Sequence, residues 1–199
     1  MVKRIDFETY LLMSPSKFII SVNDSKSKEK IFEKKKLLEN ITESIDFIQL
    51  EKFLEDNIII IEKFLNNFIN TINLIIDHKN FFKVQLSVKK DNYGKKINFE
   101  DMTYLLNEAK TQCKKTFGER KVLHMCINKY IADQKIYHSF PENFECNDFC
   151  LEINFHCLSK DFIQNLEKIF SKYQISLDRL ISAPYIKEFL QLENDNFSQ

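Results

Sequence analysis

The sequence predicts an α+β protein in which amphipathic helices cover β-sheets. Two segments alternate between apolar and other residues with a period of two, which is typical of strands with one buried face. Their apolar positions are Leu123, Met125 and Ile127 in the first segment and Leu151, Ile153, Phe155 and Cys157 in the second. Apolar residues then recur at helical spacing from Phe162 to Tyr173. A further strand is expected around Leu180-Ile181, so this region predicts a small α+β unit.

The N-terminal part has weaker signals. Met1 to Lys17 is polar apart from the short patch TYLLM, and we expect a loosely held leader there. Phe18 to Val22 predicts a strand, and Asn23-Asp24-Ser25 predicts the turn that ends it. The run Lys26 to Lys36 is dense in Lys and Glu, and its pattern fits either an exposed helix or an edge strand.

One long amphipathic helix is expected from about Leu50 to Ile76. Its apolar residues step by four and three, namely Leu54, Ile58, Ile61, Leu65, Phe68, Ile72 and Ile75. The same window contains Glu62, Lys63 and four asparagines, which are expensive inside a bilayer. A helix packed on a sheet is therefore the favoured interpretation, and binding to a membrane surface or to a partner helix is the alternative.

The middle of the chain gives clearer signals. Phe82 to Val88 alternates as a strand does, and DNYGKK, which contains Gly94, predicts a turn. Asn98 is a good N-cap for a helix that runs to Cys113 and stops at Gly118. The tail after Phe189 is polar and is expected to fray.

Composition excludes several classes of function. The 199 residues carry a formal net charge of +0, so no global basic field indicates nucleic-acid binding. The two glycines both have turn or helix-end positions, which leaves none to line a phosphate loop. Five cysteines without a secretory signal indicate a reducing, cytoplasmic compartment rather than a disulfide framework.

Two clusters of reactive side chains were weighed as chemical sites. Cys146, Cys150, His156 and Cys157 have partly suitable spacing for zinc, but adjacent residues on a strand point to opposite faces. A catalytic Cys113 or Cys126 with His124 would need a lowered thiol pKa, which nothing nearby in the sequence supplies. Structural roles are favoured for all of them, and we expect no catalytic residue, no metal and no cofactor.

Four segments resemble, in the right order, the bacterial cell-division protein FtsA, a member of the actin-like family. They are INFEDMTYLLNEAK (Ile97 to Lys110), VLHMCINKYIADQ (Val122 to Gln134), LEINFHCLS (Leu151 to Ser159) and IQNLEKIFSKYQISLDRLISAPY (Ile163 to Tyr185). The resemblance implies a small SHS2-type mixed sheet with helices on one face. It would be inserted in an incomplete actin-like, ribonuclease H-like subdomain.

On that map residues 1–88 form a partial actin-like subdomain, 89–174 the SHS2-type insertion, and 175–199 the return strand and a polar tail. The family's first strand ends in a glycine-containing turn that cradles nucleotide phosphates. The stretch that corresponds here is Phe18 to Lys28, which has no glycine. The sequence given also ends at Gln199, before the family's second phosphate loop. We therefore expect neither ATP binding nor hydrolysis by the family's mechanism.

The resemblance implies a non-catalytic interaction or scaffold module for assembly of the division machinery. Its expected partners are divisome proteins or a second copy of the chain, because an incomplete subdomain exposes a sheet edge. FtsZ contact is not expected from this segment alone, nor is direct membrane insertion. The expected location is the cytoplasm, with recruitment to the inner face of the plasma membrane at the septum. Candidate contact residues are Asn128, Tyr130, Asp133, Tyr137, Tyr104 and Lys110.

Two alternatives remain open at this stage. In the first, the chain would be the N-terminal half of a split or truncated actin-like ATP-binding protein. In the second it would be an SHS2-bearing scaffold for pilus assembly, without a role in division.

Overall fold

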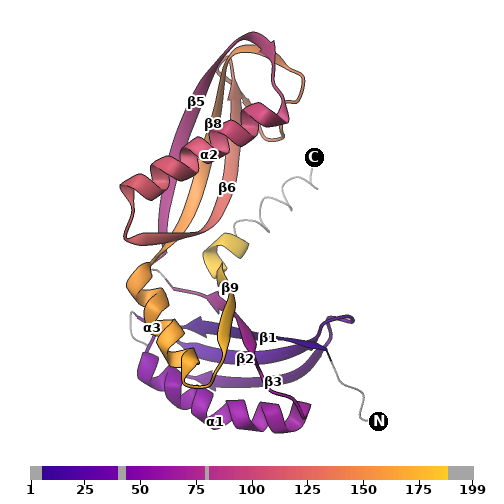
Figure 1. Cartoon of the computed structure of the whole chain (residues 1–199), viewed down its shortest axis with the longest axis vertical. Coiled ribbons are helices and arrows are strands. Elements are labelled where there is room, and N and C mark those ends of the chain that lie inside the picture. The colour runs from indigo at the N-terminus through magenta and orange to yellow at the C-terminus, as the bar shows by residue number, and fades with distance from the viewer. Residues whose placement is uncertain (1–5, 40–43, 79–80, 188–199) are drawn as a thin grey trace. The chain divides into compact units, whose positions relative to one another are not determined.

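The computed structural model describes residues 6–39, 44–78 and 81–187, in which nine strands, three helices and a further helical segment at 183–187 are found. The chain divides into two compact units. The first combines Met1–Asn80 with Asp161–Gln199, and the second, Phe81–Lys160, is inserted between these two parts. Each unit has its own sheet (Figure 1). The α+β class expected from the sequence is therefore present.

The first unit is built on a mixed five-stranded sheet. Its strands are β1 (Phe7–Ser14), β2 (Lys17–Asp24), β3 (Lys30–Leu37), β4 (Thr71–Ile76) and β9 (Ser176–Ser182), in the spatial order β3-β2-β1-β4-β9. The first three strands form an antiparallel meander, whereas β4 is parallel both to β1 and to β9. The charged run of uncertain structure is thus the edge strand β3, whose lysines suit a solvent-exposed edge.

Strand β1 lies in the middle of this sheet, so the expectation of a loosely held leader is wrong for its described part. Thr9, Leu11 and Met13 alternate along β1 and are all buried. Only two of these three are apolar, and the neighbouring Leu12 and Tyr10 blur the alternation in the sequence. The period-two signal was therefore weak, although pairing with β2 and β4 on its two sides fixes the strand.

Helix α1 (Phe47–Leu65) is shorter than expected because the helical pattern continues past its real end. Asp46 caps its start, with its Oδ1 accepting hydrogen bonds from the backbone N–H groups of Ile48 and Gln49 at 2.9 and 3.1 Å. Asn66 ends it in the left-handed conformation, with φ of 48°. The following β-branched residues form β4, so the expected helix to Ile76 is wrong beyond Leu65.

Helix α3 (Lys160–Ser171) lies beside α1 on the sheet. Past its end, Tyr173 donates a hydrogen bond from its hydroxyl to the backbone carbonyl of Glu51 at 3.3 Å, and the Lys172 ammonium is 2.8 Å from the Glu51 carboxylate. The buried residues of α3 are Ile163, Leu166, Ile169 and Phe170. The apolar stripes of both helices thus contribute to the core of the first unit.

The second unit is a four-stranded sheet with one helix on one face. Its elements are β5 (Phe82–Lys96), α2 (Phe99–Thr116), β6 (Arg120–Ala132), β7 (Lys135–Tyr137) and β8 (Glu145–Ser159), and the spatial order is β5-β8-β6-β7. Every strand pair in it is antiparallel. The expectation of a mixed sheet in this unit is therefore wrong. Leu105, Ala109 and Cys113 of α2 pack in one core with Ile153 and Phe155 of β8.

The structural boundaries of the insertion differ from the expected 89 and 174. Strand β5 begins at Phe82 and pairs with β8 on both sides of residue 88, so the whole strand belongs to the second unit. Helix α3 belongs to the first unit from Asp161 onward. Sequence periodicity locates helices and strands but does not show which sheet each one joins, which explains the difference.

Three irregularities modify two strands that the sequence predicted as regular. The DNYGKK segment is an irregularity inside β5 rather than a turn between elements, with φ of 52° at Tyr93 and 73° at Gly94. In β6 the register shifts between Val122 and His124 and again between Ile127 and Lys129, which makes Leu123 and Asn128 extra residues. Val122, and not Leu123, therefore packs against the core with Ile127.

The predictions of a loosely held leader at Met1 to Ile5 and of a frayed tail concern residues outside the described ranges. None of the helices within the described ranges is both long and apolar enough to cross a membrane.

Helix α2 provides a direct test of local sequence control. Asn98 accepts a hydrogen bond from the Asp101 N–H at 2.9 Å, and the Asp101 carboxylate accepts one from the Asn98 N–H at 3.1 Å, which completes a capping box. We expect Asn98→Ala to lower the free energy of unfolding by about 1 kcal/mol. Asn107→Ala, in the exposed middle of the same helix, is the matched control. Urea unfolding measures both, and equal effects would contradict the role of the cap.

Candidate functional site

The carboxyl ends of β1 and β4 form the edge of the first sheet where an actin-like protein would bind phosphate. Ligands of open sheets with parallel strands bind outside the carboxyl ends of those strands. Strand β1 ends at Ser14 and its parallel neighbour β4 at Ile76, and the two ends are joined by a 2.8 Å hydrogen bond from the Asp77 N–H to the Met13 carbonyl. The turn after the first strand is therefore Ser14 to Lys17.

This turn is closed by its own side chains. Ser14 and Lys17 face each other across the hairpin, with Pro15 and Ser16 between them. The Ser14 Oγ accepts hydrogen bonds from the N–H groups of Ser16 and Lys17 at 3.3 and 3.1 Å, and it donates to the Lys17 carbonyl at 3.1 Å. Pro15 has no N–H to offer. The two amides that a phosphate would need are thus already bonded within the turn.

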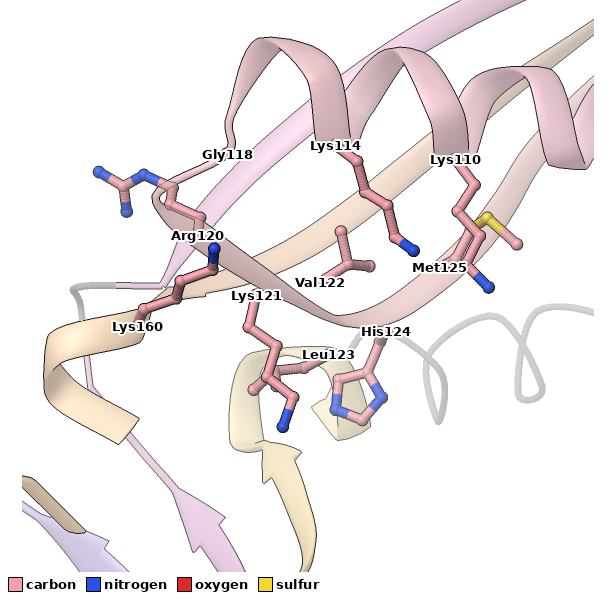
Figure 2. Close-up of a pocket in the computed structure, with 10 residues that line it drawn as sticks. All are labelled: Lys110, Lys114, Gly118, Arg120, Lys121, Val122, Leu123, His124, Met125 and Lys160. Carbon is pink, nitrogen blue, oxygen red and sulfur yellow. The ribbon is translucent and has the colours of Figure 1, made fainter. Parts of the chain in front are cut away.

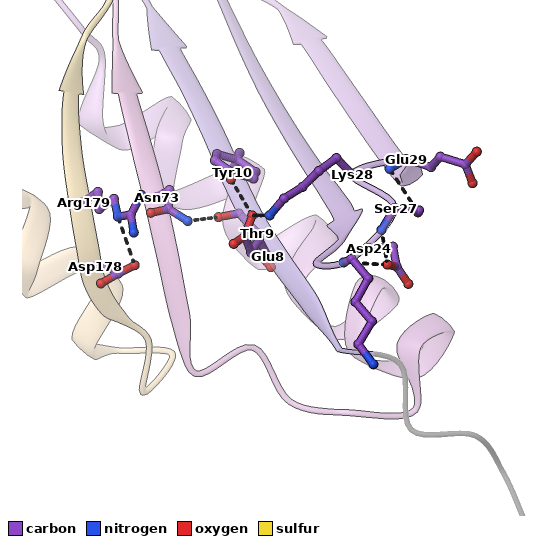
Figure 3. A network of polar contacts seen from close by, with 11 residues as sticks. Glu8, Thr9, Tyr10, Asp24, Ser27, Lys28, Glu29, Asn73, Asp178 and Arg179 are labelled. Atoms are coloured by element: carbon purple, nitrogen blue, oxygen red, sulfur yellow. Dashed lines mark hydrogen bonds and ion pairs between the residues drawn. The ribbon is translucent and has the colours of Figure 1, made fainter.

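The resemblance matched Phe18 to Lys28 to the family's first strand and its phosphate-binding turn. That match is wrong, because this stretch lies elsewhere in the sheet. Phe18 to Asp24 belongs to β2, and the turn that follows joins β2 to β3 at the opposite end of the hairpin. There Asp24 accepts hydrogen bonds from the N–H groups of Lys26 and Ser27 at 2.8 and 2.9 Å (Figure 3). The bonds from Ser27 and Lys26 lower the pKa of Asp24, so a carboxylate occupies these amides and a phosphate would be repelled.

The second unit holds a concave site whose charged lining residues are all cationic, which we call the basic pocket. It has a volume of about 700 Å³ and five cationic side chains in its lining, with no carboxylate (Figure 2). Its lining residues are Lys110, Lys114, Gly118, Arg120, Lys121, Val122, Leu123, His124, Met125 and Lys160. None of the five cations forms an ion pair with another residue of the described ranges.

The elements of the second unit explain why these cations gather. Lys110 and Lys114 are one helical turn apart on α2 and extend toward β6, whereas Lys121 and His124 extend from the other side of that strand (Figure 2). Strand β7 borders β6 only from Tyr130 to Ala132, so the first part of β6 borders β8 alone among the strands described. The pocket therefore lies along an open strand edge.

The charge of the basic pocket does not depend on its histidine near neutral pH. Burial, and to a smaller extent the neighbouring His156, lowers the pKa of His124 to about 4. The centres of the two rings are 6.4 Å apart. Arg120 lies over the Phe82 ring, with 4.3 Å between its guanidinium carbon and the ring centre, which holds this cation in place.

The candidate contact residues separate into two groups. Four take part in the packing or bonding of the second unit. Asn128 donates a hydrogen bond to Glu152 at 2.9 Å, Tyr130 packs on Phe140, Asp133 accepts from the Asn147 and Asp148 N–H groups, and Tyr137 packs on Phe144. Tyr104 is exposed on α2, and Lys110 lines the basic pocket.

The cysteines and histidines weighed for chemistry are not gathered into a reactive centre. Among the described residues, no three His, Cys, Asp or Glu side chains are placed to hold a metal ion. Burial raises the pKa of the Cys157 thiol to about 12 and also raises the pKa values of Cys113 and Cys146. These thiols remain protonated at neutral pH and pack as apolar groups.

Sequence reasoning missed both the hairpin and most of the basic pocket. For the hairpin, Ser-Pro-Ser between two short apolar runs was an available turn signal. The pocket is lined by residues of α2, the start of β6 and Lys160. These residues are far apart in the sequence, and the α2–β6 connection and the pairing of β6 with β8 bring them together. Spacing in the sequence carried no signal for the pocket.

Comparison with known proteins identifies the fold. No protein-family model matches the sequence, and no curated protein matches it. A chain of the PilM–PilN type IV pilus biogenesis complex matches with a TM-score of 0.55 and 7% identity, over 92% of this chain and 49% of that chain. This chain therefore spans about half the length of that solved chain. At this identity, the likeness is one of fold.

Two other solved structures match over most of this chain. One is the cytoplasmic domain of EpsL, an inner-membrane component of the type II secretion system of Vibrio cholerae, with a TM-score of 0.41, 9% identity, and coverage of 88% and 57% of the two chains. The other is a Bacteroides thetaiotaomicron protein with an actin-like ATPase fold, with a TM-score of 0.41, 13% identity, and coverage of 94% and 56%. The chain has the expected α+β fold, and it shares that fold with the chain of the pilus biogenesis complex.

Proposed function

We propose that the chain is a non-catalytic scaffold with an actin-like fold that binds other proteins during assembly of a larger machine. The observation that carries the proposal is the Ser14–Lys17 turn, whose amides are bonded to the Ser14 hydroxyl. A fold that normally presents backbone N–H groups to a phosphate here uses them to close a hairpin. Because these N–H groups are already bonded, they are not available to bind the phosphates of a nucleotide.

Nucleotide binding tests the proposal directly. The probe is Mg-ATP at about 5 mM. We expect it to leave the unfolding temperature of the chain unchanged, because only a ligand that binds the folded state raises that temperature. A hydrolysable and a non-hydrolysable analogue should behave alike. A saturable rise in the unfolding temperature would favour the alternative, in which the chain is one half of an ATP-binding protein.

The kind of machine is proposed from the two likenesses together. The PilM–PilN complex is a pilus biogenesis complex, and its likeness in fold covers 92% of this chain, which favours a scaffold in pilus-type assembly. The resemblance of four segments to FtsA supports the second candidate, a scaffold of the divisome. For either candidate, we propose that the chain acts in an assembly at the inner face of the plasma membrane.

The position of the protein in its source cells distinguishes these two candidates. A fluorescent fusion should gather in foci away from the septum if the chain serves pilus-type assembly. A band at the septum that follows the division cycle would instead support the divisome role.

The basic pocket is proposed as the surface that binds a partner protein. The pocket is lined by five cations and by the apolar residues Val122, Leu123 and Met125. This lining suits an acidic segment that also carries apolar side chains. The open edge of β6 lies beside them, and strand edges bind extended segments in many complexes. The partner chemistry that fits is therefore an acidic, extended stretch of polypeptide.

A synthetic peptide of alternating Glu and Val is the probe for this surface. We expect binding that weakens as salt rises and that falls at least about tenfold in Lys110→Glu/Lys114→Glu, because each reversal places a like charge against the probe. Binding should stay constant from pH 6 to 8, since His124 remains neutral there. Lys34→Glu/Lys35→Glu, on exposed β3 positions, makes the same charge change elsewhere. Equal losses in both variants, measured by fluorescence anisotropy, would contradict the assignment.

A further inference from the structure

Helix α1 exposes apolar side chains that the first unit does not cover. Ile59 and Ile60 are 59% and 50% exposed, and Phe64, one turn later, is 61% exposed. Phe32 of β3 packs against Phe64 with 5.5 Å between ring centres, which extends the apolar surface toward the sheet edge. Single exposed apolar residues are ordinary, but a continuous group on the outer face of one helix indicates a binding surface.

The charges around these residues have a symmetric pattern. Asp56, Ile59, Ile60 and Lys63 have the spacing i, i+3, i+4 and i+7, so they are neighbours on the helix surface, with the two isoleucines between the two charges. Asp56 and Lys63 are two turns apart, about 10 Å along the axis, which is too far for an ion pair between them. Neither has an ion-pair partner elsewhere in the described part of the chain.

We propose that α1 binds α1 of a second copy of the chain in an antiparallel, two-fold symmetric dimer. The two-fold axis would pass through the centre of the four-residue group. Asp56 of each copy then faces Lys63 of the other, and Ile59 of each faces Ile60 of the other. Because a two-fold interface uses the same surface twice, this one group supplies two apolar contacts and two ion pairs.

The flanking residues agree with this register. Glu55 then faces Phe64 of the second copy, and Lys52 lies beyond the end of the second copy's helix at Leu65, so no like charges meet along α1. A parallel pairing would instead place Asp56 against Asp56 and Lys63 against Lys63, which like-charge repulsion disfavours. The charges of the helix therefore select both the partner, a second copy, and the antiparallel direction.

The dimer goes beyond the proposed scaffold function, and its surface is separate from the basic pocket. A single pair of helices buries less than the roughly 1,600 Å² of a standard interface, so we expect dissociation in the micromolar range. Dimerisation would give a scaffold two identical partner-binding surfaces. Such a pair gains avidity for any partner that presents two matching segments.

Charge exchange on the whole chain tests the dimer. Sedimentation should show a reversible monomer–dimer equilibrium for the natural sequence. Asp56→Lys and Lys63→Asp should each weaken it at least about tenfold, because each places two like charges in contact twice. The double variant Asp56→Lys/Lys63→Asp, and an equimolar mixture of the two single variants, should restore it. Glu142→Lys, on an exposed position of the second unit, is the charge-matched control.

Every outcome bears on the proposal. A natural sequence that stays monomeric up to about 100 µM would overturn it, because that concentration lies well above the expected micromolar constant. A dimer that none of the α1 variants weakens would show that copies associate elsewhere. Ile60→Ser, which alters no charge, should also dissociate the dimer, and circular dichroism should show it folded because Ile60 is half exposed. Binding of the acidic probe by the α1 variants should stay unchanged, so failure of the dimer and failure of the pocket are distinguishable.

Discussion

The parallel pairing of β1 with β4 is the constraint on which the first unit depends. It joins an N-terminal hairpin to a strand more than fifty residues later, with Tyr10 opposite Asn73 and Met13 opposite Ile76. The Asn73 amide donates to the Thr9 carbonyl at 3.4 Å (Figure 3). The Asp77 N–H donates to the Met13 carbonyl at 2.8 Å. Parallel strands need a long crossover, and β3 and α1 supply it.

That pairing also decides what the carboxyl edge of the sheet can do. It brings the Ser14–Lys17 turn to the position where an open sheet usually binds ligands. The Ser14 hydroxyl then takes the amides of the turn. A serine followed by proline stabilises the hairpin locally, and the same bonds remove the donors that a phosphate would use. Stability of the turn and loss of the cradle thus have one physical cause.

The two surfaces inferred for binding lie on different units and use different chemistry. The basic pocket of the second unit presents unpaired positive charge beside an open strand edge, which favours an acidic partner. Helix α1 of the first unit presents apolar side chains between one acidic and one basic residue, which favours a copy of itself. The scaffold that we propose would use such separate surfaces, and neither requires a nucleotide.

Sequence alone predicted the elements with strong local signals and failed where long-range contacts decide. The period-two pattern of β8 and the cap at Asn98 were sufficient to locate a central strand and the start of α2. Helical periodicity continued by chance through β4, although Asn66 in the left-handed conformation ends the helix and residues 66–70 separate it from the strand. The basic pocket joins α2, β6 and Lys160, so only the sheet pairing places its five cations together.

The most direct measurement is the amide chemical shift of Ser16 and Lys17 in a ¹⁵N-labelled sample of the whole chain as Mg-ATP is added. The account predicts that both amides keep their positions and their protection from exchange, because the Ser14 hydroxyl occupies them throughout. A saturable shift of these two amides would show that the hairpin opens to bind phosphate. That result would contradict the non-catalytic scaffold and restore the nucleotide-binding role of the fold.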